Sequence, residues 1–270
     1  MAAQLQDKVV VITGGGGGIG KAAARRFLDE GASVVLSGTS REKLVAAQDE
    51  LDPSGNRTLV HAGAIRTRDD GQALAQAAIE RFGGIDVLVN STGIFRPAPF
   101  LEQTDEHLDE ALGSILRPTY WAAQAVVPSM QERGGGAIVS VGSMWAVDAI
   151  ATTPTSAYSA AQAGRHMLTK NLALELAGDG IRVNTVALAF VETPSYERFM
   201  SPEQARDVLD SVNAFHPLGR HGQPEDVVEA IVFLAGAESS WITGTMLPID
   251  GGVLAGRSPA VQPEMAEAAA

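Results

Sequence analysis

The stretch from residue 9 to residue 20 decides the fold. It reads Val9-Val10-Val11-Ile12-Thr13, then five consecutive glycines (14–18), then Ile19-Gly20. The apolar β-branched run predicts a buried strand, and the amphipathic stretch from Ile19 to Glu30 predicts a helix. Glycines at such a junction let the backbone turn sharply and let an anion approach the free amides at the helix N-terminus. The stretch therefore predicts a phosphate-binding loop.

Apolar runs and longer amphipathic stretches alternate along the rest of the chain. The runs that predict strands are residues 8–13, 32–37, 58–61, 85–90, 137–141 and 181–187. The stretches that predict helices are residues 19–30, 41–51, 69–82, 104–132 and 157–177. Such alternation requires parallel strands joined by right-handed crossovers, with helices on both faces of one sheet. We predict an α/β protein whose single domain, residues 1–256, is a Rossmann-type doubly wound parallel sheet.

Composition excludes several classes of function. The 270 residues include 20 Lys and Arg against 32 Asp and Glu, a net charge of −12, and no cysteine. Disulfides, thiolate metal sites and cysteine nucleophiles are therefore absent. The basic residues form no dense run, so a nucleic-acid surface is not expected. No apolar segment approaches the ~18 residues of a membrane span. We expect a cytoplasmic protein without metal, membrane or nucleic-acid partners.

Two segments interrupt the alternation. Residues 190–215 mix apolar and charged side chains between a strand and the next helix, and we expect a short helical excursion over the carboxyl edge of the sheet. Ligands of such sheets bind at that edge, so this segment is a candidate substrate lid. The tail from Arg257 to Ala270 is rich in Ala, Glu and Pro, and is predicted to be disordered.

Six motifs, in order, resemble those of the short-chain dehydrogenase/reductase family. They lie at residues 13–20 (TGxxxGIG), 83–93, 136–143, 158–161, 180–184 and 242–252, and the likeness extends from Leu5 to Val253. The resemblance implies an oxidoreductase that transfers hydride between a nicotinamide dinucleotide and a small or medium hydrophobic ketone or alcohol. It also implies cofactor contacts from Gly14, Gly16, Gly17, Gly18, Ile19, Gly20, Gly38, Thr39, Ser40, Arg41, Ala64, Ile65, Asn90, Ser91, Thr92, Gly93, Tyr158, Gln162, Val191 and Thr193.

The end of the second strand favours NADP(H) over NAD(H). An acidic residue there would bind the ribose hydroxyls and repel a 2′-phosphate, but the chain has Thr39, Ser40 and Arg41. Ser40 is equally suited to cap the helix that begins at Arg41, and both roles can hold at once. Against this preference, Gly17 stands where NADP-preferring relatives often have a basic residue. Ala64 stands where the family usually has an Asp near the adenine, so an adenine contact is lost.

By the same resemblance, Ser143 orients the substrate oxygen and Tyr158 is the general acid or base. The family's lysine, four residues after the tyrosine, is Gln162 here. A glutamine can bind a ribose hydroxyl but carries no charge to favour tyrosinate. The family's relay asparagine falls at Ile115, or in a shifted register at Gly113. We therefore expect reduction, which needs a neutral phenol, to survive better than oxidation.

The sequence alone leaves the roles of several other candidate residues open. Arg165 and His166 follow Tyr158 by about two helical turns, ~10–12 Å along the axis, and are predicted to serve a surface or a subunit contact. Met144, Trp145 and Tyr196 either line the substrate pocket or fill the core.

Two alternatives to a reductase follow from the missing lysine and asparagine. One is a non-redox lyase or isomerase on the same fold, and the other is a dinucleotide-binding regulator that has lost hydride chemistry. The resemblance also implies a homo-oligomer, a tetramer or dimer, formed through helices 104–132 and 157–177. Their alanine-rich faces permit close approach, although packing on the sheet would use the same faces.

Overall fold

The core of the structure is one parallel sheet. The computed structural model describes residues 5–151, 153–198 and 200–256, and it contains seven parallel strands in the order β3-β2-β1-β4-β5-β6-β7. The strands are β1 (Val9–Thr13), β2 (Ser33–Gly38), β3 (Thr58–Ala62), β4 (Val87–Asn90), β5 (Gly136–Ser143), β6 (Ile181–Leu188) and β7 (Met246–Ile249). The order reverses between β1 and β4, as in a doubly wound sheet. The predicted fold class and the single domain are confirmed.

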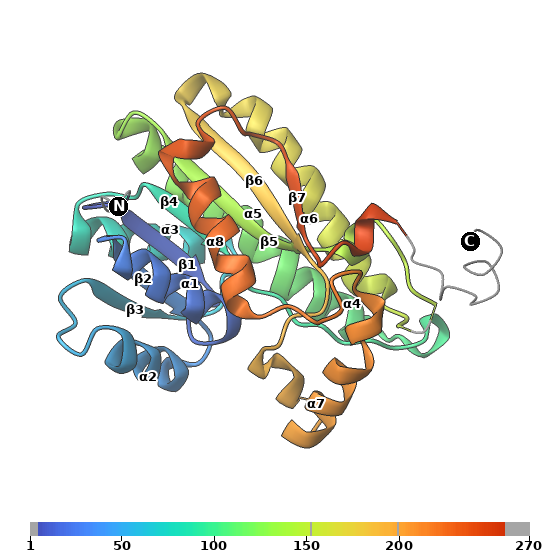
Figure 1. Cartoon of the computed structure of the whole chain (residues 1–270). Coiled ribbons are helices and arrows are strands. Elements are labelled where there is room, and N and C mark those ends of the chain that lie inside the picture. Colours follow the sequence, from blue (N-terminus) through green and yellow to red (C-terminus); the bar gives the residue numbers. More distant parts are fainter. Residues whose placement is uncertain (1–4, 152, 199, 257–270) are drawn as a thin grey trace, which may run out of the picture.

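Helices cover both faces of this sheet (Figure 1). They are α1 (Gly18–Asp29), α2 (Arg41–Leu51), α3 (Arg68–Phe82), α4 (Asp105–Ala111), α5 (Arg117–Glu132), α6 (Ser156–Glu175), α7 (Pro202–Ser211) and α8 (Pro224–Ala235). Alternate side chains of a strand point to opposite faces. Val10 and Ile12 accordingly pack with α1, α2 and α8, whereas Val11 packs with α3 and α5. Two apolar layers therefore hold the sheet, and its carboxyl edge is left for loops.

The region predicted as one helix over residues 104–132 is interrupted. A π-helical turn, Leu112–Leu116, separates α4 from α5. Pro118 lies just inside α5 and has no backbone N–H, so the carbonyls of the preceding turn lose a donor. The hydroxyl of Thr119 donates to the carbonyl oxygen of Ile115 at 2.7 Å, and the Arg165 guanidinium donates to the same oxygen at 3.0 Å.

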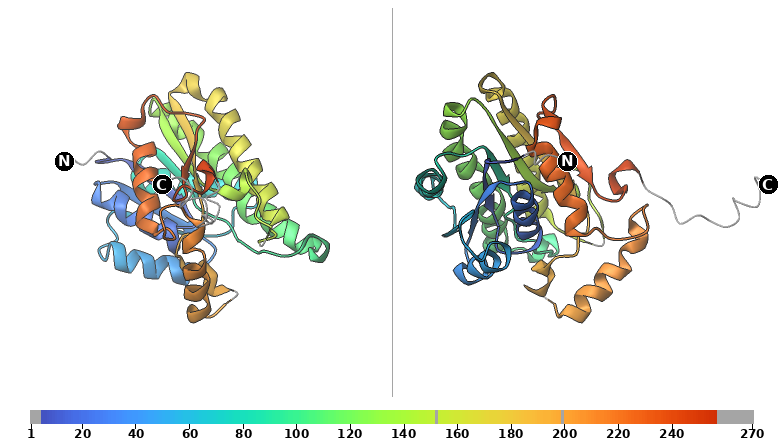
Figure 2. Two further views of the ribbon diagram at one scale, coloured as in Figure 1. Left: turned by 45° about the vertical axis from the view of Figure 1, so that its right-hand side comes forward. Right: turned by 60° about the vertical axis from the view of Figure 1, so that its left-hand side comes forward.

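The segment predicted as a helical excursion contains two 3₁₀ turns, Pro194–Arg198 and Asn213–Phe215, on either side of α7. Ser201 caps α7 by accepting a hydrogen bond from the backbone of Gln204. The helix projects from the body of the molecule in all three ribbon views (Figures 1 and 2). The tail predicted as disordered, residues 257–270, lies outside the described residues.

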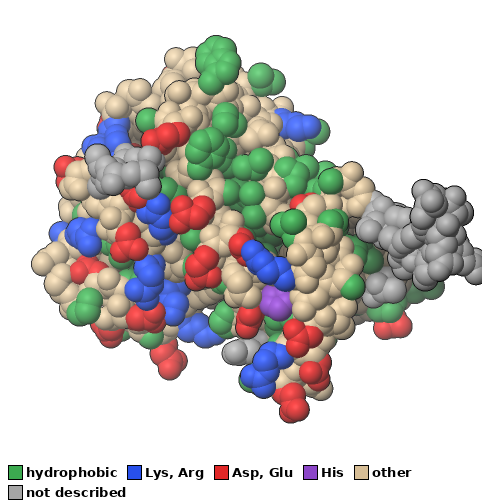
Figure 3. All heavy atoms as spheres, in the orientation of Figure 1, with side chains coloured by type: hydrophobic (Ala, Val, Ile, Leu, Met, Phe, Trp, Pro, Cys, Tyr) green, Lys and Arg blue, Asp and Glu red, His purple; other side chains and the backbone are tan. Residues whose placement is uncertain are grey.

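The surface agrees with the acidic composition. On the face in Figure 3, basic and acidic side chains are interspersed over α1, α2 and α8, and the basic ones form no separate patch. Among the described residues, no helix combines the length and the apolar character that crossing a bilayer requires.

Candidate active site

A cavity of about 450 Å³ opens at the carboxyl edge of the sheet, within the size range of ligand pockets. The loops that follow β1, β2, β3, β4, β5 and β6 all contribute to its wall. Its lining contains two cationic side chains, Lys43 and Arg165, and no carboxylate from the described part of the chain. In a protein with a net charge of −12, this distribution favours an anionic ligand.

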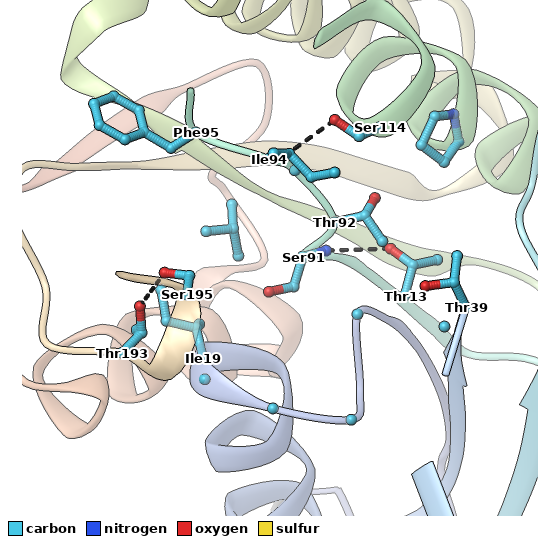
Figure 4. Close-up of a pocket in the computed structure, with 18 of the residues that line it drawn as sticks. Thr13, Ile19, Thr39, Ser91, Thr92, Ile94, Phe95, Ser114, Thr193 and Ser195 are labelled. Carbon is cyan, nitrogen blue, oxygen red and sulfur yellow. Dashed lines mark hydrogen bonds between the residues drawn. The ribbon is translucent and has the colours of Figure 1, made fainter. Parts of the chain in front are cut away.

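The glycine loop forms one wall of the cavity. Gly14 and Gly18 have φ angles of +76° and +50°, which side chains disfavour. A Cβ on Gly20 would lie 2.2 Å from the carbonyl oxygen of Gly14, so only glycine lets α1 pack this closely on the loop. The first turn of α1 contains no acidic residue, and its positive dipole end is left for an anion. Figure 4 shows this loop passing between Thr39 on one side and Thr193 with Ser195 on the other.

The end of β2 caps a helix and also lines the cavity. The Ser40 hydroxyl accepts a hydrogen bond from the backbone N–H of Lys43 at 3.3 Å, and so caps α2, while Ser40 also lines the cavity beside Thr39. Arg41 is exposed and does not reach the cavity. In this segment, the cationic side chain that lines the cavity is Lys43, which the sequence analysis missed. Its position three residues after the capping serine was the available signal, because N3 and the cap lie together at a helix start.

Tyr158 and Gln162 lie one turn apart on α6 and meet in the cavity. The Gln162 side-chain N–H donates to the Tyr158 hydroxyl at 3.0 Å, and the buried Gln162 Oε1 has no donor among the described residues. Ser143, the last residue of β5, lines the same cavity and accepts a hydrogen bond from the backbone of Trp145. The structure therefore brings the three predicted catalytic residues to one cavity.

Most predicted cofactor residues also line the cavity. These are Gly14, Gly16, Gly17, Gly18, Ile19, Gly38, Thr39, Ser40, Ala64, Ile65, Ser91, Thr92, Gly93, Val191 and Thr193. Besides Arg41, the structure leaves Gly20 and Asn90 out of the lining. Gly20 lies behind the loop, and the fully buried side-chain amide of Asn90 makes no hydrogen bond with a described residue.

Aromatic side chains also line the cavity. Phe95 packs edge-on against Tyr158 with 5.0 Å between ring centroids, and Trp145 packs edge-on against Phe190 at 5.1 Å. Tyr196 also lines the cavity, whereas Met144 is buried outside its lining. Of the three residues left open above, two belong to the cavity and one to the core.

The prediction of a surface or subunit contact for Arg165 and His166 is wrong. Their exposed fractions are 1% and 7%. Helical side chains lean toward the N-terminus, so Arg165 reaches back along α6 to the cavity despite two turns of separation from Tyr158. His166 packs against Gly142, where a Cβ would lie 2.2 Å from its Nε2. Neither ring nitrogen of His166 has a hydrogen-bond partner among the described residues.

This burial predicts a pH-dependent stability. Burial, together with the positive charges of Arg165 and Lys170, lowers the pKa of His166 to about 4. The unfolded chain, with a histidine pKa near ~6.5, then binds more protons than the folded protein, and stability falls as pH drops from about 6.5 toward 4. At pH ~4.5 this effect lowers the free energy of unfolding by roughly 2 kcal/mol.

Denaturant unfolding at neutral and acidic pH measures this contribution. His166→Leu removes the titrating group, and we expect its free energy of unfolding to fall less on acidification than that of the wild-type protein. Equal losses in both proteins would contradict the assignment.

The cavity fits a dinucleotide. Four of its lining residues carry buried polar atoms without a partner among the described residues: the hydroxyls of Ser37 and Thr92, the indole N–H of Trp145 and the Gln162 Oε1. Buried polar atoms are usually satisfied, so such a cluster marks a site for a polar ligand. A Cβ at Gly17 would meet nothing within 4 Å, so there is room beside the N-terminus of α1.

Comparison with known proteins identifies the family. The model for the family described as Enoyl-(Acyl carrier protein) reductase matches residues 15–254. The 3-oxoacyl-(acyl-carrier-protein) reductase FabG of Thermotoga maritima is 38% identical over 251 residues, covering 93% of this chain and 99% of that protein. The (2S)-((R)-hydroxy(phenyl)methyl)succinyl-CoA dehydrogenase subunit BbsD of Thauera aromatica is 34% identical, covering 92% and 97%.

Solved structures agree. Levodione reductase superposes with a TM-score of 0.86 at 31% identity, covering 93% of this chain and 99% of the other. A short-chain alcohol dehydrogenase from Sinorhizobium meliloti 1021, itself described as putative, gives a TM-score of 0.85 at 28% identity, covering 94% and 99%. The relatives are oxidoreductases, and neither the non-redox alternative nor the regulator is favoured. The chain therefore belongs to the short-chain dehydrogenase/reductase family of NAD(P)-dependent oxidoreductases.

Proposed function

We propose that the protein reduces a small or medium hydrophobic ketone with NADPH. One observation carries the proposal: the Tyr158 hydroxyl, held by Gln162 at 3.0 Å, lines the same cavity as a glycine loop suited to an anion and a wall of aromatic rings. The aromatic wall favours an apolar substrate body, since burial of apolar area supplies its affinity. The names of the relatives, which include reductases and dehydrogenases of ketone or alcohol substrates, support this class.

Each part of the proposed reaction is given to a residue of the cavity. When bound, the dinucleotide would supply the hydride. The amides of the glycine loop would bind its pyrophosphate, and the Gln162 Oε1 would accept a hydrogen bond from a nicotinamide ribose hydroxyl. Ser143 and Tyr158 donate hydrogen bonds to the substrate oxygen, and Tyr158 then gives up its phenolic proton as negative charge develops there. Val191 and Thr193 would hold the nicotinamide carboxamide.

The second conclusion is a preference for NADP(H), carried by Lys43 with Thr39 and Ser40 at the end of β2. A charge-assisted hydrogen bond contributes about 1.5–3 kcal/mol, so Lys43→Glu should weaken NADPH binding at least about tenfold and leave NADH binding little changed. Fluorescence titration with both dinucleotides measures the effect. Arg41→Glu introduces the same charge change outside the cavity and is the control. Equal losses for NADPH and NADH in Lys43→Glu would contradict the preference.

The activity is tested by binding and turnover together. We expect NADPH to bind, as measured by its fluorescence, and to be consumed with apolar ketones from a panel of increasing size. Tight binding without consumption on any ketone, acyclic, cyclic or aromatic, would contradict the proposed function.

We also propose a cytoplasmic homo-oligomer, a tetramer or dimer. The support is the exposed apolar side chains on α4, α5 and α6, namely Leu108, Tyr120, Met167 and Leu174, with exposed fractions of 47%, 45%, 57% and 82%. Large exposed apolar residues that gather on neighbouring helices are typical of subunit contacts. Light scattering coupled to size-exclusion chromatography gives the subunit number.

A further inference from the structure

Arg165 is a buried cation that the reaction described so far does not use. Its guanidinium makes four hydrogen bonds: from Nε to the Thr119 hydroxyl at 3.0 Å, from Nη2 to the carbonyls of Thr92 at 2.6 Å and Ile115 at 3.0 Å, and from Nη1 to the carbonyl of Val141. These acceptors come from α5, from the loop after β4, from the π-helical turn and from β5. The group is therefore held in place in the wall of the cavity.

The hydrogen bonds of Arg165 are all to neutral acceptors. No carboxylate forms an ion pair with it in the part of the chain that the structure describes. A guanidinium has five N–H donors, and the second N–H of Nη1 has no acceptor among the described residues. An unpaired buried charge costs several kcal/mol, so a structural role alone accounts poorly for a cation here. A neutral donor would make the same hydrogen bonds to these carbonyls, so the bonds alone do not require a charge.

The charge of Arg165 persists at neutral pH. Burial lowers the pKa of Arg165 to about 10, and the phenol of Tyr158 offsets part of that effect because a phenolate would favour a charged guanidinium. Burial raises the pKa of Tyr196 and lowers that of His166, so both groups stay neutral at neutral pH. Arg165 therefore keeps its charge in the cavity that the Tyr158 hydroxyl also lines.

We propose that Arg165 supplies the positive charge for which the family resemblance expects a lysine at position 162. The two functions of that lysine are divided in this chain. Gln162 holds the Tyr158 hydroxyl and offers Oε1 to the ribose, while Arg165, one further turn along α6, provides the electrostatic stabilisation. It also binds the Ile115 carbonyl, in the turn where the resemblance places a relay asparagine. Arg165 is a positioning residue, because it acts through Tyr158.

The charge balance of the reduction explains why this cation matters. Hydride adds to the carbonyl carbon, the π-electron pair moves to the oxygen, and that oxygen takes the Tyr158 proton. Tyr158 is left as a phenolate, and a proton from solvent later restores it. A fixed guanidinium stabilises this phenolate without reorganisation. Oxidation begins from the phenolate, so the same charge should keep that direction accessible as well.

The inference rests on the proposed function, but a spectroscopic measurement tests it independently of turnover. The chain has three tyrosines, and the ultraviolet absorbance of tyrosinate, with Tyr158→Phe to assign the signal, reports where the Tyr158 phenolate forms. In Arg165→Met we expect that step to move upward by about one pH unit or more, about 1.4 kcal/mol. In the double variant Arg165→Met/Gln162→Lys we expect it to move back. Arg165→Gln, which keeps donors for the carbonyls, is the second neutral variant if Arg165→Met fails to fold.

Kinetics provides the second readout. Arg165→Met should lower the turnover of ketone reduction by about tenfold to a hundredfold with NADPH affinity little changed, and Gln162→Lys in that background should restore most of the loss. Gln162→Lys alone should gain little, because the site already has its cation.

The matched control is Arg182→Met. Arg182 also donates to backbone carbonyls, those of Leu234 and Gly236, but at the opposite end of the sheet. We expect it to lose stability without any change in the tyrosinate titration. An unchanged titration in folded Arg165→Met, or a loss that Gln162→Lys does not restore, would overturn the inference. An inactive wild-type protein with the expected titration shifts would contradict the proposed function alone.

Discussion

Tyr158→Phe should lower the turnover of ketone reduction by about 10²–10⁴-fold, the usual contribution of a general acid. The phenolic proton is the one that the substrate oxygen takes, and the ring of phenylalanine keeps the edge-on packing against Phe95. The Gln162 amide loses its acceptor, at a cost of about 1–2 kcal/mol of stability. NADPH affinity should change little, because the glycine loop and the β2 end are untouched.

Steady-state kinetics with fluorescence titration of NADPH separates these effects. Tyr120→Phe is the matched control: Tyr120 is 45% exposed on α5 and does not line the cavity, so turnover should match that of the wild type. If Tyr158→Phe kept more than about a tenth of the wild-type turnover, Tyr158 would not be the proton donor.

Gly20→Ala should weaken both coenzyme binding and the fold, although Gly20 does not line the cavity. The added Cβ would lie 2.2 Å from the Gly14 carbonyl oxygen, so α1 must move away from the glycine loop. Such overpacking costs about 1–3 kcal/mol, which lowers the Tm by about 2–4 °C for each kcal/mol in a chain of this size. NADPH affinity should fall more than about tenfold, because the helix N-terminus no longer faces the phosphates.

Gly17→Ala is the control for this change. Gly17 has an extended backbone, with φ −177°, and a Cβ there meets nothing within 4 Å. Thermal unfolding should therefore give a nearly wild-type Tm for Gly17→Ala. Equal losses of Tm in both alanine variants would contradict the clash at Gly20 as the cause of the destabilisation.

The fold could be predicted from sequence because its signals are local and repeated. The β-branched runs and the glycine turn after Val9–Thr13 define the parallel sheet, and α2 has the predicted bounds of Arg41–Leu51. The break at Leu112–Leu116 was missed because a π-helical turn has the same apolar residues as the helix around it. Its signal was Pro118, whose missing N–H disturbs the turn before it.

Residues of the candidate site could be predicted where both the residue type and its spacing match a family motif. Ser143, Tyr158 and Gln162 follow from the motifs, and the structure brings all three to one cavity. Arg165 was missed because its distance from Tyr158 was measured along the helix axis, whereas a long side chain leans back toward the helix N-terminus. Lys43 was missed because the pattern identifies the end of β2 but not which side chain of α2 turns into the cavity.

The central claim is that hydride passes from a dinucleotide on the glycine loop to a carbonyl carbon beside Tyr158. The most direct measurement uses NADPH deuterated at the transferring position of C4, an apolar ketone and mass spectrometry of the product. We predict an alcohol with one deuterium on the carbinol carbon, formed by the wild-type protein and nearly lost in Tyr158→Phe. Alcohol without deuterium, or unchanged labelled product from Tyr158→Phe, would contradict the account.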